Sequence, residues 1–260
     1  MAGTLTSTRK ITNTAGSQPV LTTSAQINIP KICITLDHLG ENQALTSLQI
    51  AQQLKKEQIP VTVFVFCSGS KDLCASEVLD TETAKQKIFS NPNLEHRCSE
   101  KQWKMLKDLH AMGVTLGIHT LATVPTPTEP NIPSKATQTA NIDYLRFVIH
   151  LITGNYPNVA SYHGSGAGPH PNIDLNGKGV AFVRGVSTTD GGKYNTPIKT
   201  NALKSLKELD SSKVNTFFFH SNEAAVESEA KKVYNALISG VKTKKYQAIN
   251  YYQAMKANYG

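Results

Sequence analysis

The sequence predicts an α/β fold in which mostly parallel strands alternate with helices. Short apolar runs rich in β-branched residues recur along the chain, and segments with helical periodicity separate them. The runs at 31–36 (KICITL) and 61–66 (VTVFVF) are typical of buried strands, and a helical pattern over 44–57 lies between them. Strands joined through a helix pair in parallel with a right-handed crossover. An α/β barrel and a doubly wound sheet both satisfy this pattern.

The alternation continues to the end of the chain. Ser99 and Glu100 open a helix that ends at Gly113. Further strands are predicted at 114–119, 159–162, 180–183, 185–187, 215–220 and 246–250, and further helices at about 137–153 and 223–239. With no internal repeat and no splitting linker after residue 26, we expect one domain over 27–260. The Thr/Ser-rich segment 1–26 is expected to be a flexible leader.

Composition narrows the class of protein and its partners. Hydrophobic residues make up 39% of the chain, which is ordinary for a globular domain with a sizeable core. No run approaches the roughly 18 consecutive apolar residues of a membrane span, so we expect none. The net charge of +8 favours acidic surfaces, but no Lys/Arg block typical of nucleic-acid binding is present. We therefore expect no nucleic-acid partner, and the oligomeric state stays open.

The four cysteines do not predict a zinc ribbon, because no CxxC pair exists among them. Cys33 lies in an apolar strand pattern and is expected to be a buried thiol. One disulfide among Cys67, Cys74 and Cys98 could close a loop, which fits an oxidising compartment. The sequence leaves their pairing open.

Polar side chains follow several of the apolar runs directly. Because sites in parallel α/β folds form at the carboxyl ends of strands, we expect these side chains to converge on one cavity. Histidines at four strand ends predict metal binding or acid–base chemistry there. The residues are Asp37 and His38, then His119, Thr120 and Thr123, then Tyr162 and His163, then Asp190, and finally His220.

Five segments, taken in order, carry a resemblance to a known family. The segment 35–38 (TLDH) is similar to T-F-D-D, and 119–123 (HTLAT) is similar to H-[ST]-x-x-[HS]. The segments 163–167 (HGSGA), 185–190 (GVSTTD) and 218–220 (FFH) stand where R-x-P-Y-G, an Asp-bearing strand end and L-x-H are expected. From about Lys31 to Met255 the chain thereby resembles the NodB-homology polysaccharide deacetylases, carbohydrate esterase family 4. This resemblance implies a deformed (β/α) barrel of mostly parallel strands.

The resemblance also implies roles for individual residues. Asp37 falls on the catalytic base, and His220 falls on the acid that protonates the departing amine. The implied metal ligands are His38, His119 and Thr123, with His38 in place of an aspartate and Thr123 in place of His or Ser. The implied substrate-binding residues are His163, Gly166, Asp190 and Tyr162, with His163 where the family has an Arg that orients the base.

The implied activity is hydrolysis of N-acetyl groups on amino-sugar polymers of the chitin or peptidoglycan type. The implied cofactor is a divalent metal, with zinc suited to the nitrogen ligands. Since three of the five segments are altered, a second hypothesis stays open: a catalytically silent, carbohydrate-binding pseudoenzyme. The expected partner is an N-acetylated polysaccharide or oligosaccharide. The expected location is secreted, periplasmic or cell-wall associated, although the first 25 residues lack the apolar core of a signal peptide.

Overall fold

The structure is a computed structural model that describes residues 29–37, 44–65, 100–122, 134–163, 175, 177–184, 195–196, 198–199, 203–220 and 229–259. Its strands are β1 (Lys31–Asp37), β2 (Val61–Val65), β3 (Thr115–Ala122), β4 (Val159–His163), β5 (Phe182–Arg184), β6 (Asn195–Thr196), β7 (Ile198–Lys199), β8 (Val214–His220) and β9 (Gln247–Ala248). Its helices are α1 (Ala44–Lys56), α3 (Glu100–Ala111), α4 (Lys135–Thr153), the 3-10 helix η2 (Leu203–Lys207), α5 (Glu229–Lys242) and α6 (Tyr251–Tyr259).

The strands form one sheet in the order β6-β5-β4-β3-β2-β1-β8-β7, with β9 pairing to β1. Every strand pair within the described ranges is parallel. Along the ladder between β1 and β8, Lys31 pairs with Val214 and Asp37 pairs with His220. The predicted α/β class with mostly parallel strands is therefore confirmed.

The sheet curls into a deformed barrel. Its two edge strands, β6 and β7, are separated in the chain by residue 197 alone, so the chain itself brings the two edges together. In a flat sheet, β5 and β1 would lie about 19 Å apart, because strands are spaced by about 4.8 Å. Arg184 of β5 nevertheless forms an ion pair with Asp37 of β1. Of the two architectures that the sequence allows, the barrel is the one observed.

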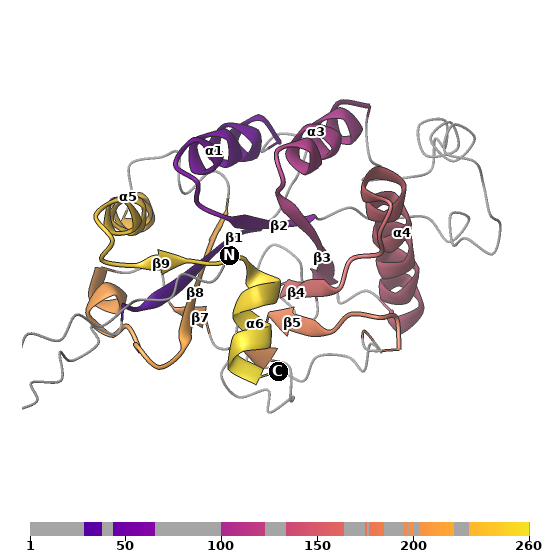
Figure 1. Ribbon diagram of the computed structural model, residues 1–260. Coiled ribbons are helices and arrows are strands. Elements are labelled where there is room, and N and C mark those ends of the chain that lie inside the picture. The colour runs from indigo at the N-terminus through magenta and orange to yellow at the C-terminus, as the bar shows by residue number, and fades with distance from the viewer. Residues whose placement is uncertain are drawn as a thin grey trace, which may run out of the picture.

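The two faces of the sheet have different partners. On the outer face, Ile34 and Leu36 pack into the main core with α1, α3, α4 and α5, which Figure 1 shows arranged around the outside of the strands. On the inner face, Cys33, Val159 and Val214 pack against α6. These three residues lie near the beginnings of their strands, so α6 closes the amino end of the barrel interior. The carboxyl end of the interior is left for polar groups.

Local sequence determines where the helices α3 and α4 end and the chain turns toward β3 and β4. α4 begins after Ser134, whose Oγ accepts a hydrogen bond from the Thr137 N–H at 3.1 Å. The helix ends at Gly154, which has a φ of 74°, and Gly113 after α3 has a φ of 81°. Glycine adopts this left-handed conformation without the strain that a Cβ imposes. Both turns lead directly into strands that carry site residues.

Several boundaries differ from the predicted ones. The helix predicted over about 223–239 is described as α5 over Glu229–Lys242. The strand predicted over 246–250 is only Gln247–Ala248, because α6 begins at Tyr251. The strands β6 and β7 were not predicted, since two residues are too few to show a periodicity.

Cys33 is buried and free, as predicted. Cys67, Cys74, Cys98 and the predicted leader at 1–26 lie outside the described residues. None of the helices in the described ranges is long and apolar enough to span a membrane.

Candidate active site

Asp37 is the last residue of β1 and lies at the carboxyl end of the barrel interior. Its side chain is only 4% exposed. A charged carboxylate removed from water is unfavourable unless opposite charge or hydrogen bonds compensate it. The surroundings of Asp37 therefore determine both its stability and its chemistry.

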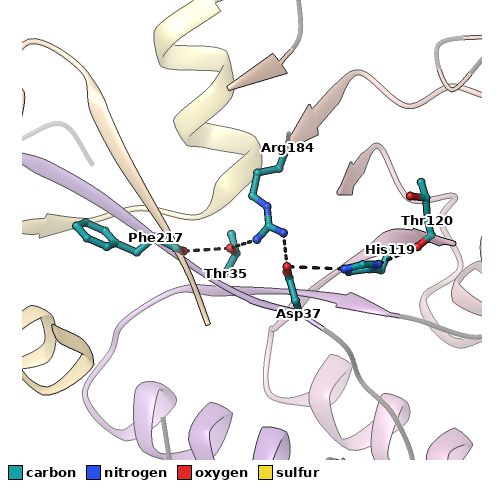
Figure 2. A network of polar contacts seen from close by, with 6 residues as sticks. All are labelled: Thr35, Asp37, His119, Thr120, Arg184 and Phe217. Carbon is teal, nitrogen blue, oxygen red and sulfur yellow. Dashed lines mark hydrogen bonds and ion pairs between the residues drawn. The ribbon is translucent and has the colours of Figure 1, made fainter. Parts of the chain in front are cut away.

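Arg184, the last residue of β5, supplies the compensating charge and is itself fully buried. Its Nη2 donates a hydrogen bond to Oδ2 of Asp37, and its Nη1 donates to Oγ1 of Thr35 at 2.7 Å (Figure 2). The Thr35 hydroxyl donates in turn to the carbonyl oxygen of Phe217 at 3.0 Å. Arg184 thus crosses the interior from β5 and joins it to β1 and, through Thr35, to β8.

Two aromatic rings flank the Arg184 guanidinium. Its central carbon lies 5.0 Å from the ring centroid of Phe64 and 5.1 Å from that of Phe218. The negative faces of aromatic rings attract a cation, and the attraction grows when water is excluded. The same exclusion of water strengthens the ion pair with Asp37. The guanidinium is therefore fixed both by hydrogen bonds and by the rings around it.

These contacts set the charge state of Asp37. Burial is the largest influence and raises the pKa of the carboxyl group, but the charge of Arg184 and the contacts with His119 oppose it and hold the pKa of Asp37 below its ordinary value. Asp37 is consequently a carboxylate at neutral pH. Its Oδ1 is buried and has no hydrogen-bond partner among the described residues. One oxygen is held by Arg184, and the other is left for a ligand.

His119 lies on the inner face of β3, with Nε2 3.7 Å from Oδ2 of Asp37. Its Nδ1 is 3.0 Å from the carbonyl oxygen of Thr120. A carbonyl oxygen only accepts hydrogen bonds, so Nδ1 carries the hydrogen in this contact. Nε2 is thereby left facing the carboxylate (Figure 2). A backbone contact of this kind fixes the tautomer and ring orientation of histidines that bind metals.

The strand register extends the polar site along the sheet. Arg184 is the partner of Ser161 on β4, and Ser161 is the partner of His119 on β3, which gives a polar row across three strands. The Ser161 hydroxyl is buried and has no hydrogen-bond partner within the described ranges. Asp37 is the partner of His220 on β8. Partners on adjacent parallel strands point to the same face, with backbones about 4.8 Å apart.

The remaining predicted residues are not brought into this cluster. Tyr162 packs against the main core on the outer face, on the other side of the sheet from Asp37. Neighbouring residues of a strand point to opposite faces, so Tyr162 faces the helices while Ser161 faces the interior. We therefore do not propose Tyr162 as a substrate-binding residue. His163 pairs with Ala122 at the end of β4, and its side chain lies outside the described part. His38, Thr123, Gly166 and Asp190 also lie outside the described residues.

The described donors fit a divalent cation that takes nitrogen and oxygen ligands. His119 has its tautomer fixed with Nε2 toward the carboxylate, and Oδ1 of Asp37, a buried oxygen without a hydrogen-bond partner in the described ranges, can accept a hydrogen bond from a water molecule beside such an ion. Such donors suit zinc and related ions. The described part of the chain contains no group of three His, Cys, Asp or Glu side chains placed to hold a metal. His38 and Thr123, the other predicted ligands, lie outside it.

Sequence reasoning missed Arg184 and Ser161. Arg184 directly follows the apolar run at 180–183, so the rule that selects polar residues at strand ends would have included it. Ser161 lies inside a strand, where only the alternation of inward and outward residues identifies it. The sequence could not show that β5 faces β1 across the interior.

No protein-family model matches the sequence, and no curated protein matches it.

Solved structures, in contrast, share the architecture. The peptidoglycan deacetylase PdaC from Bacillus subtilis has 15% identity and a TM-score of 0.51, over 89% of this chain and 92% of that chain. A mutant of BA3943, described as a family 4 pseudoenzyme with restored enzymatic activity, has 12% identity and a TM-score of 0.50, over 88% of this chain and 68% of that chain. The protein therefore has the fold of the family 4 polysaccharide deacetylases, as the resemblance predicts.

Proposed function

We propose that this protein is a divergent NodB-homology deacetylase that hydrolyses N-acetyl groups on amino-sugar polymers of the chitin or peptidoglycan type. One observation carries the proposal: the buried Asp37 carboxylate is held on Oδ2 by Arg184 and faces His119, while Oδ1 has no partner among the described residues. Buried polar atoms that serve structure alone are almost always hydrogen-bonded. An oxygen left open beside a fixed histidine is what a reacting water molecule requires.

In this proposal Asp37 accepts a proton from the water that attacks the acetyl carbonyl. The lowered pKa of Asp37 keeps it ionised at neutral pH, so the base is in the required form. Arg184 occupies Oδ2, which directs the water to Oδ1. Thr35 accepts a hydrogen bond from Arg184 and so fixes the guanidinium that holds the Asp37 carboxylate. Because the carboxylate already has one orientation, it loses little orientational entropy in the reaction.

His220 is the proposed acid for the departing amine. It is the register partner of Asp37, so acid and base lie on the same face of adjacent strands. As the carbon–nitrogen bond breaks, the nitrogen takes a proton from His220, and the water oxygen becomes part of the released acetate. The proton taken up by Asp37 then passes through solvent to His220, which returns both residues to their starting states.

The proposed cofactor is a divalent ion, with zinc favoured by the nitrogen donors. The residues that would hold it are His119 and, as predicted from the sequence, His38 and Thr123. When bound, such an ion supplies Lewis-acid polarisation of the acetyl carbonyl. The contribution of this chain is to fix the His119 ring through Thr120, with Nε2 turned toward the site.

A second candidate function is a carbohydrate-binding pseudoenzyme, and one observation favours it. The charge of Arg184 lowers the pKa of Asp37, and a carboxylate with a low pKa has little tendency to accept a proton. The similar structure of BA3943 is described as a family 4 pseudoenzyme, with a TM-score of 0.50. In this candidate the same site binds the polymer without cleaving the amide.

The substrate class sets the proposed location and partner. Chitin and peptidoglycan lie outside the cell membrane, so we propose that the protein is secreted, periplasmic or cell-wall associated. The net charge of +8 suits polymer surfaces that carry acidic groups. The proposed partner is the N-acetylated polysaccharide itself.

Acetate release from the hexamer of N-acetylglucosamine separates the two candidates. The Asp37→Asn variant keeps the shape of the side chain and removes the base, so release is expected to fall by about 10²- to 10⁴-fold. Asp108→Asn, on the exposed face of α3 beside Lys104, is the matched control and is expected to leave release unchanged. Release that survives Asp37→Asn removes Asp37 from the role of base. A wild type that binds the hexamer without releasing acetate establishes the pseudoenzyme.

The metal assignment is tested by the zinc content of protein purified in the presence of zinc. His119→Ala removes the fixed nitrogen donor and is expected to reduce bound zinc to near background. His110→Ala, on the exposed part of α3, is the control and is expected to bind as much zinc as the wild type. Equal zinc in His119→Ala and the wild type contradicts the assignment.

A further inference from the structure

A hollow of about 290 Å³ lies at the amino end of the sheet, away from Asp37. It is formed between the ends of α3 and α4 and the beginnings of β3 and β4. Its polar lining residues are His110, Thr115, Thr153, Asn155, Tyr156 and Asn158. Among the described residues that line it there is no Asp, Glu, Lys or Arg, which suits an uncharged ligand with hydrogen-bonding groups.

The sequence TGNYP at 153–157 places an aromatic ring at the mouth of this hollow. Gly154 ends α4 in the left-handed conformation and turns the chain back. Oγ1 of Thr153 donates to the carbonyl oxygen of Asn155 at 2.8 Å and accepts from the Asn155 N–H at 3.1 Å, which closes the turn. Pro157 then restricts the backbone of Tyr156 to extended conformations. The position of the Tyr156 ring follows from these local constraints.

The Tyr156 ring is both exposed and held in place. It stacks on His150 with centroids 4.3 Å apart and an angle of 11°, and the Arg146 guanidinium lies 4.8 Å from its centroid. Tyr156 is nevertheless 55% exposed, more than any other large hydrophobic side chain in the described ranges. A ring that is fixed before binding loses little conformational entropy when a ligand arrives. Such a ring is a preformed stacking surface.

We propose that Tyr156 and the adjacent hollow bind a sugar ring of the same amino-sugar polymer that the catalytic site acts on. A pyranose ring presents a face of C–H groups that stacks on an aromatic ring, and hydroxyl and acetamido groups at its edge. The amide, hydroxyl and imidazole groups of Asn155, Asn158, Thr115 and His110 match those edge groups in hydrogen-bonding type.

This second site lies apart from the catalytic one on the same strand. Thr115 begins β3 in the hollow, and His119 lies four residues further on, about 13 Å away at about 3.3 Å per residue. Insoluble chitin presents many chains, so a molecule retained at Tyr156 stays close to substrate for the site at Asp37. The inference rests on the proposed function for the identity of the ligand.

Retention on insoluble chitin tests the inference directly. Tyr156→Ala removes the ring and is expected to reduce retention about tenfold, which is the scale of one aromatic contact. Tyr156→Phe keeps the ring and is expected to be retained like the wild type. Both variants are expected to keep the circular dichroism spectrum of the wild type, so a difference in retention does not reflect unfolding. Equal retention of the Ala variant and the wild type overturns the inference.

A fluorescence experiment tests the same contact without removing the ring. The sequence contains one tryptophan, Trp103, which is buried in the main core, so its emission is a constant background. In Tyr156→Trp the new indole replaces the exposed ring, and its emission is expected to shift as the hexamer is added. An emission that stays constant up to millimolar hexamer contradicts the inference.

The Asp37→Asn variant separates failure of this inference from failure of the proposed function. It is expected to lose acetate release and to keep its Tyr156-dependent retention on chitin. Tyr156-dependent retention in a wild type that releases no acetate supports the sugar site and rejects the deacetylase. If the wild type releases acetate but Tyr156→Ala is retained on chitin as well as the wild type, the sugar site is rejected and the deacetylase is not.

Discussion

The two faces of β1 differ in what they contribute to the protein. On the outer face, Ile34 and Leu36 are fully buried among apolar side chains of the surrounding helices. On the inner face, Thr35 and Asp37 are buried just as deeply, but their partners are a charge and hydrogen-bonding groups. Dispersion and the hydrophobic effect hold the first face, and neither depends on direction. The second face is held by directional contacts, which also hold the pKa of Asp37 below its ordinary value.

Side chains that are equally buried on the two faces are therefore not expected to tolerate substitution equally. An apolar core accepts changes that keep its volume, at less than about 1.5 kcal/mol. A buried polar cluster loses more when one member is removed, because the remaining charge stays buried without its partner. The two faces of one strand therefore make a controlled comparison.

The largest effect is expected from Arg184→Met. This change leaves the Asp37 carboxylate buried without its counter-charge, and it should lower the free energy of unfolding by about 3–5 kcal/mol. Urea denaturation at pH 7 measures it. The double variant Arg184→Met with Asp37→Asn should recover part of the loss, because no buried charge remains. A double variant as unstable as the sum of the two single variants would show that the ion pair is not the cause.

A smaller effect is expected on the outer face from Leu36→Ala. The lost side-chain volume leaves a cavity under the helices and should lower the free energy of unfolding by about 2–5 kcal/mol. Leu36→Met keeps the volume and is the control, with a loss below about 1.5 kcal/mol. Neither change touches the inner face, so the folded protein should release acetate at the wild-type rate. A large loss of activity at full folding would contradict the separation of the faces.

The smallest effect is expected from pH. The pKa of Asp37 is lower in the folded protein than its ordinary value of about 3.9, so its contribution to stability is present above that value and is lost as the pH falls toward the folded pKa. The difference in unfolding free energy between the wild type and Asp37→Asn should be constant above about pH 5 and shrink below about pH 4. Urea denaturation between pH 7 and pH 3 measures this difference. A shrinkage that begins near neutral pH would contradict the lowered pKa.

The fold and part of the site could be predicted because both depend on patterns local in the sequence. The apolar runs that became β1, β2, β3 and β8 are short and strongly apolar, and helices separate the first three. The end of a parallel strand marks where a site forms, so Asp37, His119 and His220 could be singled out before their positions were known. Asp37 lies next to the other two, by a contact of 3.7 Å between its Oδ2 and Nε2 of His119 and by strand register to His220.

The rest of the site depends on information that a strand-end rule lacks. Tyr162 and His163 were both selected at the end of one strand, yet neighbouring residues point to opposite faces, and Tyr162 points to the helices. Arg184 reaches Asp37 only because the sheet curls through four strand spacings. Curvature is a property of the whole sheet, and no single segment of the sequence encodes it.

The short outermost strands have a consequence for how other molecules can attach. β6 and β7 are two residues long, so within the described part of the chain the two ends of the sheet offer very little free backbone. Long open edges invite another chain to add a strand, which is a common route to aggregation and to peptide capture. Strand addition at these two ends of the sheet is therefore disfavoured.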